Sequence, residues 1–308
     1  MQHSLTLTGK RRLEWSRTNV KSLEKDEILV RTVYGAISIG AELPQYDESN
    51  VSDHLPHYPR ETGYESFGIV MEAGDEVTHL ERGDHVVAFY GHKDLAVVKA
   101  DKAVKVPEGV EGSIALLNTL SCDAAKGVLK LKPAKKDRVL VTGAGTMGLL
   151  AIHFLKSFMN VEHIDALEPN EARREKAKSF GADICYSDKA EIPERTYDYG
   201  LECSGRNEAF HALLKSLKHN GEACVLSDGN KELLRLNEYF YEKELKIVGS
   251  SDGWNYGEHA RWFFDNCLKT PHLSSLFEHK ILSHQLIDCF SDLSEGKINP
   301  IKVLVHYK

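Results

Sequence analysis

The spacing of apolar residues changes about one third of the way along the chain. Before residue 110, short runs of β-branched and aromatic residues alternate with turns such as Gly74-Asp75 and Gly83-Asp84. This pattern predicts many short strands, which is typical of a small barrel or sandwich. The predicted strands span 27–34, 68–74, 85–90, 95–98 and 103–106.

From residue 112 the apolar residues first follow a helical period, to residue 129, and then helices and strands alternate. This alternation predicts an α/β fold with a doubly wound parallel sheet and right-handed crossovers. After a first strand at 139–141, the predicted strands span 163–167, 184–186, 197–202, 222–227 and 245–249, with helices at 170–180 and 208–217.

The last 55 residues contain two helical patterns, 257–268 and 284–293, and a final strand pattern at 301–305. No helical crossover follows that strand, so we expect it to pair with the N-terminal strands. We therefore predict two domains, one formed by residues 1–112 and 254–308 and the other by residues 113–253. The polar segment 43–62 is predicted to be a long surface loop.

Composition narrows the class of protein. The chain has 308 residues, 42% hydrophobic content, a net charge of −7 and no dense basic run, which argues against nucleic acid or an anionic membrane as the main partner. No apolar run approaches the ~18 residues of a membrane span, and the N-terminus lacks an apolar signal region. The six cysteines are scattered without a C-x-x-C pair. We expect a reduced, cytoplasmic protein.

A glycine motif lies between the strand at 139–141 and a helix that starts near Met147. Gly143, Gly145 and Gly148 have the spacing G-x-G-x-x-G, and Glu168 follows twenty residues later, after a second apolar run. In this arrangement the glycines allow a tight turn, approach of a pyrophosphate and close packing of helix on strand, while the acidic residue binds a ribose. The pattern predicts a dinucleotide site.

The choice between NAD and NADP depends on Glu168. A carboxylate accepts hydrogen bonds from a ribose 2′-hydroxyl and repels a 2′-phosphate, which favours NAD. NADP remains an alternative because Arg173 or Arg174 could bind a 2′-phosphate, although their acidic neighbours indicate a solvated helix face. Further candidate contacts to the cofactor are Thr146, Met147, Ser204, Leu226 and Ser227.

The chain resembles the medium-chain dehydrogenase/reductase family, which includes the zinc-type alcohol dehydrogenases. The resemblance covers nearly the whole chain, and its motifs are Gly63-Tyr64-Glu65 with Gly68, Gly83-Asp84-His85-Val86, Val106-Pro107-Glu108-Gly109, the glycine motif, 178–183, Glu202-Cys203-Ser204-Gly205 and 243–250. It implies a GroES-like β-barrel catalytic domain, a Rossmann domain and an active site in the cleft between them. It also implies a homodimer, which could form through the edge strand 245–248.

Two departures from the zinc-containing relatives concern the metal. Those relatives have a cysteine and a histidine where this chain has Ile39 and Tyr64, and only Cys122 falls near a third ligand position. Isoleucine cannot bind zinc, and a catalytic zinc needs three protein ligands. We therefore predict no zinc. A rearranged site using Glu42, His54, His57 or His92 is the alternative.

Without zinc, another group must donate to the oxygen of the carbonyl group that is reduced. The phenol of Tyr64 is the leading candidate, since it stands at the vacated ligand position. Glu42 and Glu65 could orient a donor, Cys122 could line the nicotinamide pocket, and His92 is a weaker candidate because it is expected in a surface loop. The threonine of the relatives' proton relay is replaced by Ala41.

These features predict a zinc-independent NAD(P)-dependent oxidoreductase that acts on a secondary alcohol or ketone. The closest resemblance is to the zinc-lacking branch with the bacteriochlorophyllide hydroxyethyl dehydrogenases, and the expected partner is a small-molecule substrate. Two alternatives remain. One is a quinone or enoyl reductase that uses NADPH, and the other is a catalytically silent nucleotide-binding protein.

Overall fold

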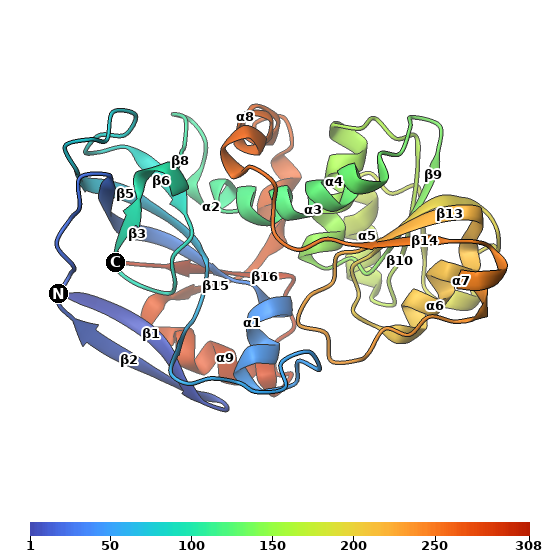
Figure 1. The fold of residues 1–308 in the computed structure, drawn as a ribbon, viewed down its shortest axis with the longest axis horizontal. Coiled ribbons are helices and arrows are strands. Elements are labelled where there is room, and N and C mark those ends of the chain that lie inside the picture. The colour runs from blue at the N-terminus through green and yellow to red at the C-terminus, as the bar shows by residue number, and fades with distance from the viewer. The chain divides into compact units, whose positions relative to one another are not determined.

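The chain folds as two units, each built around its own sheet (Figure 1). The computed structural model describes residues 1–308, the side chain of Pro271 excepted. The first unit comprises residues 1–49, 53–119 and 256–308, and the second comprises residues 50–52 and 120–255.

The first unit contains a seven-stranded sheet and a smaller three-stranded sheet. In the large sheet the strand order is β15-β16-β3-β5-β6-β8, with β7 paired to β3. These strands are β3 (Glu27–Ile37), β5 (Glu65–Ala73), β6 (His85–Ala88), β7 (Leu95–Lys99), β8 (Val104–Lys105), β15 (Phe277–Leu282) and β16 (Lys302–His306). The small sheet has the order β2-β1-β4, formed by β1 (Gln2–Gly9), β2 (Arg12–Thr18) and β4 (Arg60–Glu61). The helices of this unit are α1 (Ile39–Tyr46), α2 (Gly112–Ala115), α8 (Tyr256–Cys267) and α9 (Leu286–Ser294).

The final strand returns to the N-terminal part of the chain, as predicted. β16 pairs antiparallel with β3, and Val303, Leu304 and Val305 are almost fully buried. A strand of consecutive apolar residues is stable only when both of its faces are covered, which explains why it does not remain at the surface. β15, which pairs with β16, was not predicted.

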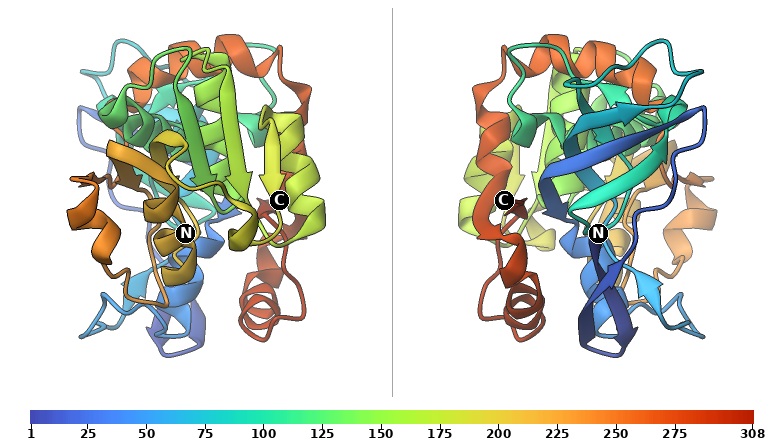
Figure 2. Two further views of the ribbon diagram at one scale, coloured as in Figure 1. Left: turned by 90° about the vertical axis from the view of Figure 1, so that its right-hand side faces the viewer. Right: turned by 90° about the vertical axis from the view of Figure 1, so that its left-hand side faces the viewer.

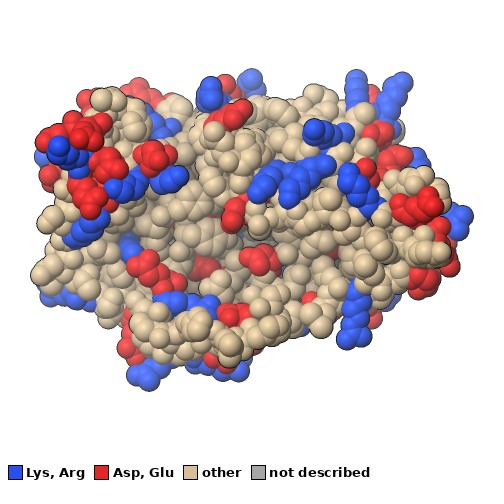
Figure 3. Space-filling view, viewed as in Figure 1, with Lys and Arg blue, Asp and Glu red and all other residues tan. Residues whose placement is uncertain are grey.

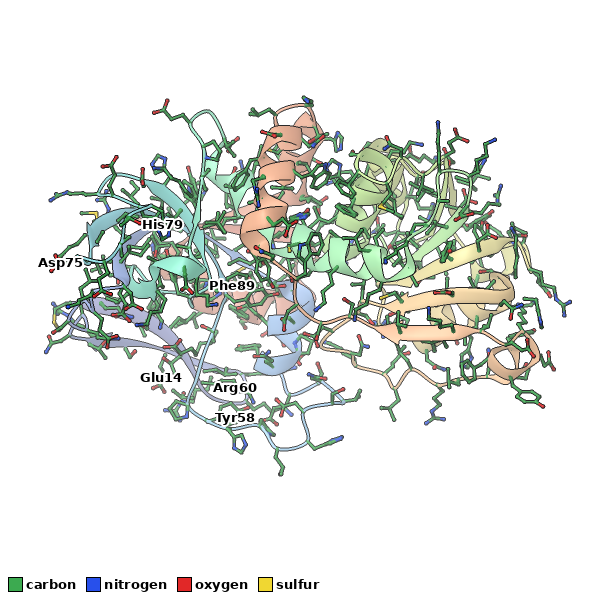
Figure 4. The ribbon with its side chains drawn as sticks, turned by 45° about the horizontal axis from the view of Figure 1, so that its top comes forward. Glu14, Tyr58, Arg60, Asp75, His79 and Phe89 are labelled. Atoms are coloured by element: carbon green, nitrogen blue, oxygen red, sulfur yellow. The ribbon has the colours of Figure 1, made fainter. Side chains whose placement is uncertain are left out.

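The predicted loop 43–62 is only partly a loop. Its first residues belong to α1, and β4 pairs its last residues with β1. The prediction was wrong at both ends, because Leu43, Pro44 and Tyr46 are buried in α1 and the residues of β4 pair with β1. In the remaining irregular part, the Arg60 guanidinium lies over the Tyr58 ring at 5.5 Å and forms an ion pair with Asp53 (Figure 4).

The second unit is a parallel six-stranded sheet with helices on both faces (Figure 2). Its order is β11-β10-β9-β12-β13-β14, and every pairing is parallel. The strands are β9 (Arg138–Thr142), β10 (His163–Leu167), β11 (Ile184–Tyr186), β12 (Tyr197–Glu202), β13 (Leu217–Val225) and β14 (Lys246–Gly249). The helices are α3 (Asn118–Leu131), α4 (Thr146–Ser157), α5 (Glu171–Phe180), α6 (Asn207–Ser216) and α7 (Glu238–Glu242). The predicted α/β fold with a doubly wound sheet is confirmed.

The strand order reverses between β9 and β12, because β10 and β11 extend the sheet on one side of β9 and β12, β13 and β14 extend it on the other. In doubly wound sheets the ligand binds at this switch point, beyond the carboxyl ends of the strands. The topology therefore predicts that a ligand binds next to the residues that follow β9, β10, β12 and β13.

Local sequence signals explain the helix boundaries that were predicted well. α5 begins after Asn170, whose side chain accepts a hydrogen bond from the backbone N–H of Arg173, and ends at Gly181, which is left-handed with φ 118°. These are the favoured residues for the two ends of a helix. The predicted single helix at 114–129 is instead divided into α2 and α3.

In the described part of the chain, no helix is both long and apolar enough to cross a membrane. On the face drawn in Figure 3, basic and acidic side chains are interspersed.

Candidate functional site

The turn after β9 has the geometry of a phosphate-binding loop. Gly143 is left-handed with φ 87°, and a Cβ at this residue would lie 2.9 Å from the Cα of Ser204. A Cβ at Gly148 would lie 1.9 Å from the carbonyl oxygen of Gly143. Neither position has room for a side chain. A Cβ at Gly145, in contrast, would meet no atom within 4 Å, so the space beside this residue is open.

Helix α4 starts at this open space. Gly145 is its N-cap and supplies no side-chain capping bond. The first N–H groups of an α-helix have no partner within the helix, and together with the helix dipole they attract anions. Gly145, Thr146 and Met147 therefore form an edge at which a pyrophosphate would fit, with space in front of it.

Glu168 follows β10 and reaches the same turn. Its two carboxylate oxygens accept hydrogen bonds from the backbone N–H groups of Ala144 and Asn170, each at 2.9 Å. These bonds fix the carboxylate beside the glycine turn, where a ribose hydroxyl could use its remaining lone pairs. The Arg174 guanidinium donates to the backbone carbonyls of Glu168 and Pro169, so it is anchored to the backbone next to this site.

Glu202, the last residue of β12, was not predicted as a site residue. It is fully buried, and its carboxylate accepts hydrogen bonds from the backbone N–H and hydroxyl of Ser204, the backbone N–H of Gly205 and the hydroxyl of Ser227. The signal was present in the sequence, since an acidic residue that ends a buried strand needs several donors.

Leu226 and Cys122 are both buried. The Leu226 side chain is buried, and a Cβ on Gly127 of α3 would lie 2.6 Å from it, so Leu226 packs against that helix. Cys122 is buried in α3, and burial raises the pKa of its thiol to about 11. A thiol with that pKa is neutral near pH 7.

The first unit contains a linked polar cluster at the start of α1. The Tyr64 hydroxyl donates to the Ser38 hydroxyl at 2.6 Å, and the backbone N–H of Ser38 donates to Glu42 Oε1 at 2.8 Å. Glu42 thereby closes the first turn of α1 in the manner of a capping residue. Its other oxygen accepts from His92 Nε2 at 3.0 Å.

The expectation that His92 lies in a surface loop was wrong. Its side chain is 2% exposed and packs against Gly63, whose hypothetical Cβ would lie 2.9 Å from the imidazole ring. Backbone bonds from the His92 N–H to Thr62 and from Leu5 to the His92 carbonyl hold this segment against neighbouring strands. These pairings are 30 residues or more apart in sequence, which is why local pattern did not reveal them.

A buried ion pair lies in the same sheet. Lys302 of β16 donates to Glu65 Oε1 of β5 at 2.6 Å, and both side chains are at most 1% exposed. Burial raises the pKa of Glu65, and the ammonium group of Lys302 opposes that shift. Glu42 and His92, which are hydrogen-bonded to each other, have smaller opposing effects on the pKa of Glu65.

Known proteins resemble both parts of the chain. The family described as "Alcohol dehydrogenase GroES-like domain" matches residues 24–108, and the family described as "Zinc-binding dehydrogenase" matches residues 146–261. L-threonine 3-dehydrogenase of Chromobacterium violaceum is 24% identical over 253 residues, which are 70% of this chain and 73% of the relative.

Solved structures resemble the whole chain. Galactitol-1-phosphate dehydrogenase from Escherichia coli has a TM-score of 0.86 and 17% sequence identity, with 99% of each chain covered. A putative zinc-binding dehydrogenase from Sinorhizobium meliloti, solved with NADP bound, has a TM-score of 0.84 and 17% identity, again with 99% of each chain covered. At such identities the likeness concerns the fold, and it confirms the predicted GroES-like and Rossmann architecture.

Proposed function

Because the chain belongs to the zinc-type alcohol dehydrogenase-like branch of the medium-chain dehydrogenase/reductase family, we propose that it interconverts a secondary alcohol and a ketone without zinc. It is an NAD(P)-dependent alcohol dehydrogenase-like enzyme. The observation that supports the proposal best is the hydrogen bond between the hydroxyl groups of Tyr64 and Ser38. Tyr64 occupies the sequence position at which the zinc-containing relatives have a metal ligand.

The donor groups of the first unit do not fit a zinc ion. Ile39 has no donor atom, and the Tyr64 hydroxyl is bonded to Ser38. Both oxygens of Glu42 are engaged, by Ser38 and His92, and Glu65 is paired with Lys302. No group of three histidine, cysteine, aspartate or glutamate side chains suited to a metal was found among the described residues. Since a catalytic zinc needs three such ligands, these residues support a zinc-lacking branch.

The glycine turn, by contrast, fits a nicotinamide dinucleotide, because the space beside Gly145 and the edge of α4 suit its pyrophosphate. Bound NADH would supply the hydride for ketone reduction. The Tyr64–Ser38 pair then provides the proton that the reduced carbonyl oxygen needs. Tyr64 is half-buried, so solvent can return a proton to it after turnover.

The substrate class follows from this chemistry and from the relatives. Their names are those of dehydrogenases for threonine and galactitol 1-phosphate, both hydroxylated compounds. We propose a small polar secondary alcohol of this kind. Activity on enones or quinones in place of ketones would instead indicate a quinone or enoyl reductase. Binding of NADH without turnover of ketones, enones or quinones would indicate a catalytically silent nucleotide-binding protein.

The Tyr64→Phe variant tests the proton donor. We expect kcat for ketone reduction to fall on the order of 100-fold, while the Kd for NADH stays within about twofold of its original value. The matched control is Tyr58→Phe, which removes the hydroxyl of another tyrosine of this unit, one bonded to Glu48. Steady-state kinetics and a fluorescence titration give both values. An unchanged kcat in Tyr64→Phe would remove Tyr64 from the mechanism.

For the cofactor, we propose NAD in preference to NADP. The support is Glu168, whose carboxylate is fixed beside the turn, and Arg174, whose guanidinium is engaged with backbone carbonyls. We expect kcat/KM for NADH to exceed that for NADPH by about tenfold or more. In the Glu168→Ser variant, the ratio of these two kcat/KM values should be smaller. A preference of the unmodified protein for NADPH would reverse this assignment.

For assembly, we propose a homodimer that pairs β14 with its copy. β14 is the last strand of the six-stranded sheet, and unpaired edge strands invite pairing with another chain. The molar mass measured by light scattering distinguishes the dimer from a monomer.

A further inference from the structure

Glu202 joins two loops at the carboxyl edge of the parallel sheet. One loop follows β12 and contains Ser204 and Gly205, and the other follows β13 and contains Ser227. Oε1 of Glu202 accepts from the Ser204 N–H at 2.8 Å, the Ser204 hydroxyl at 2.5 Å and the Gly205 N–H at 3.0 Å. Oε2 accepts from the Ser227 hydroxyl at 2.5 Å. A single carboxylate thus holds both loops.

The hydrogen-bond donors to the Glu202 carboxylate are all uncharged groups. Glu202 is fully buried, and no lysine, arginine or histidine in the described part of the chain forms an ion pair with it. Burying a carboxylate is costly unless its lone pairs are satisfied, so the two loops must keep their donors in place.

A second layer of contacts extends the arrangement. The Ser227 hydroxyl, which donates to Glu202, accepts a hydrogen bond from the Asn230 side chain at 3.1 Å. Gly205 is left-handed with φ 64°, and a Cβ there would lie 2.4 Å from Asn230 Oδ1. The loops after β12 and β13 are therefore interlocked, with Glu202 at the centre of their contacts.

The location of these loops connects them with one half of the dinucleotide. The glycine turn after β9 and Glu168 after β10 lie on one side of the switch point and suit the pyrophosphate and the adenine ribose. In a sheet of this topology the two mononucleotide halves of the ligand lie on opposite sides of that point. The loops after β12 and β13 consequently face the nicotinamide half.

We propose that Glu202 is a positioning residue that holds the loops after β12 and β13 in the conformation that binds the nicotinamide half of the cofactor. Glu202 does not touch the cofactor in this account and acts through Ser204, Gly205 and Ser227. The inference requires only that the protein binds NAD(P), and it is independent of the zinc question.

The test compares NADH with ADP, which is the adenine half alone, in the Glu202→Gln variant. The amide nitrogen of glutamine cannot accept from the donors that surround it, so the loops lose part of their support. We expect the Kd for NADH to rise about 30-fold and the Kd for ADP to change less than twofold. The KM for NADH should rise more than kcat falls.

The matched control is Asp165→Asn. Asp165 is an equally buried carboxylate of the same sheet, on β10, and it accepts from Tyr197, Arg138 and the backbone of Ile184. Its loss should lower stability without changing the ratio of the NADH and ADP Kd values. An unchanged Kd for NADH in Glu202→Gln, or an equal rise for NADH and ADP, would overturn the proposal.

A gentler variant keeps the test decisive if Glu202→Gln does not fold. Ser227→Ala removes one donor and leaves the charge in place. We expect the Kd for NADH to rise about fivefold and the Kd for ADP to remain unchanged. If Ser227→Ala and the original protein bind NADH with equal affinity, the loops after β12 and β13 do not support binding of the nicotinamide half.

Discussion

Replacing Gly145 by aspartate is expected to abolish cofactor binding while the fold stays intact. A Cβ at this residue meets no atom within 4 Å, and the backbone is extended with φ −78°, which suits any L-residue. Aspartate is also a favoured N-cap, so α4 should be at least as stable as before. Its carboxylate, however, would occupy the space of the pyrophosphate and repel it.

We expect the Kd for NADH to rise about 1000-fold, equivalent to about 4 kcal/mol, with a melting temperature equal to or above that of the original protein. Gly145→Asn is the matched control, because asparagine has the same size and capping ability but no charge, and it should lose less affinity. Gly148→Ala should behave in the opposite way, losing stability, because its Cβ would lie 1.9 Å from a carbonyl oxygen. Tight NADH binding by Gly145→Asp would mean that the turn does not bind the pyrophosphate.

The second large effect is expected on stability, from Lys302→Met. This variant leaves Glu65 buried without its partner, and breaking a buried ion pair at one side typically costs about 3–5 kcal/mol. The double variant Glu65→Leu with Lys302→Met should recover much of the loss, because a well-packed apolar pair has no charge to desolvate. Lys99→Met, which removes the partly exposed ion pairs of Lys99 with Glu24 and Asp26 and its longer contact with Glu27, should cost much less stability than Lys302→Met.

The loss in Lys302→Met should also depend on pH. Burial raises the pKa of Glu65 and Lys302 opposes the shift, so without Lys302 the carboxyl has a pKa further above its unfolded value. A group with a raised pKa in the folded state favours folding at low pH and loses this contribution as the pH rises through that pKa. The deficit measured by denaturant unfolding should therefore be smaller at pH 5 than at pH 8. A deficit independent of pH would show that Glu65 is not the source.

Features with a local cause could be predicted from the sequence. The turn at Gly143 needs a left-handed residue, and α5 has Asn170 and Gly181 at its two ends, so neighbouring residues alone decide both. The parallel sheet followed from the alternation of apolar runs with helical segments. The return of β16 to the N-terminal strands was predicted because no helical crossover follows this strand.

Pairings between distant residues could not be predicted in this way. Glu42 and His92 are 50 residues apart, and Glu65 and Lys302 are 237 residues apart. A polar residue carries no local sign of whether a distant partner will satisfy it, so His92 was taken as a residue of a surface loop. Glu202 did carry a local sign, because it ends a buried strand, but the sequence does not show that its donors come from two different loops.

The central claim is that this enzyme reduces a ketone with protein hydroxyl groups in place of zinc. The most direct measurement is the zinc content of protein purified without chelator, taken together with NADH-dependent ketone reduction before and after treatment with a chelator. We predict well under one zinc per chain, and the same kcat after chelation. One tightly bound zinc per chain, with activity that is lost on chelation and restored by zinc, would contradict the account.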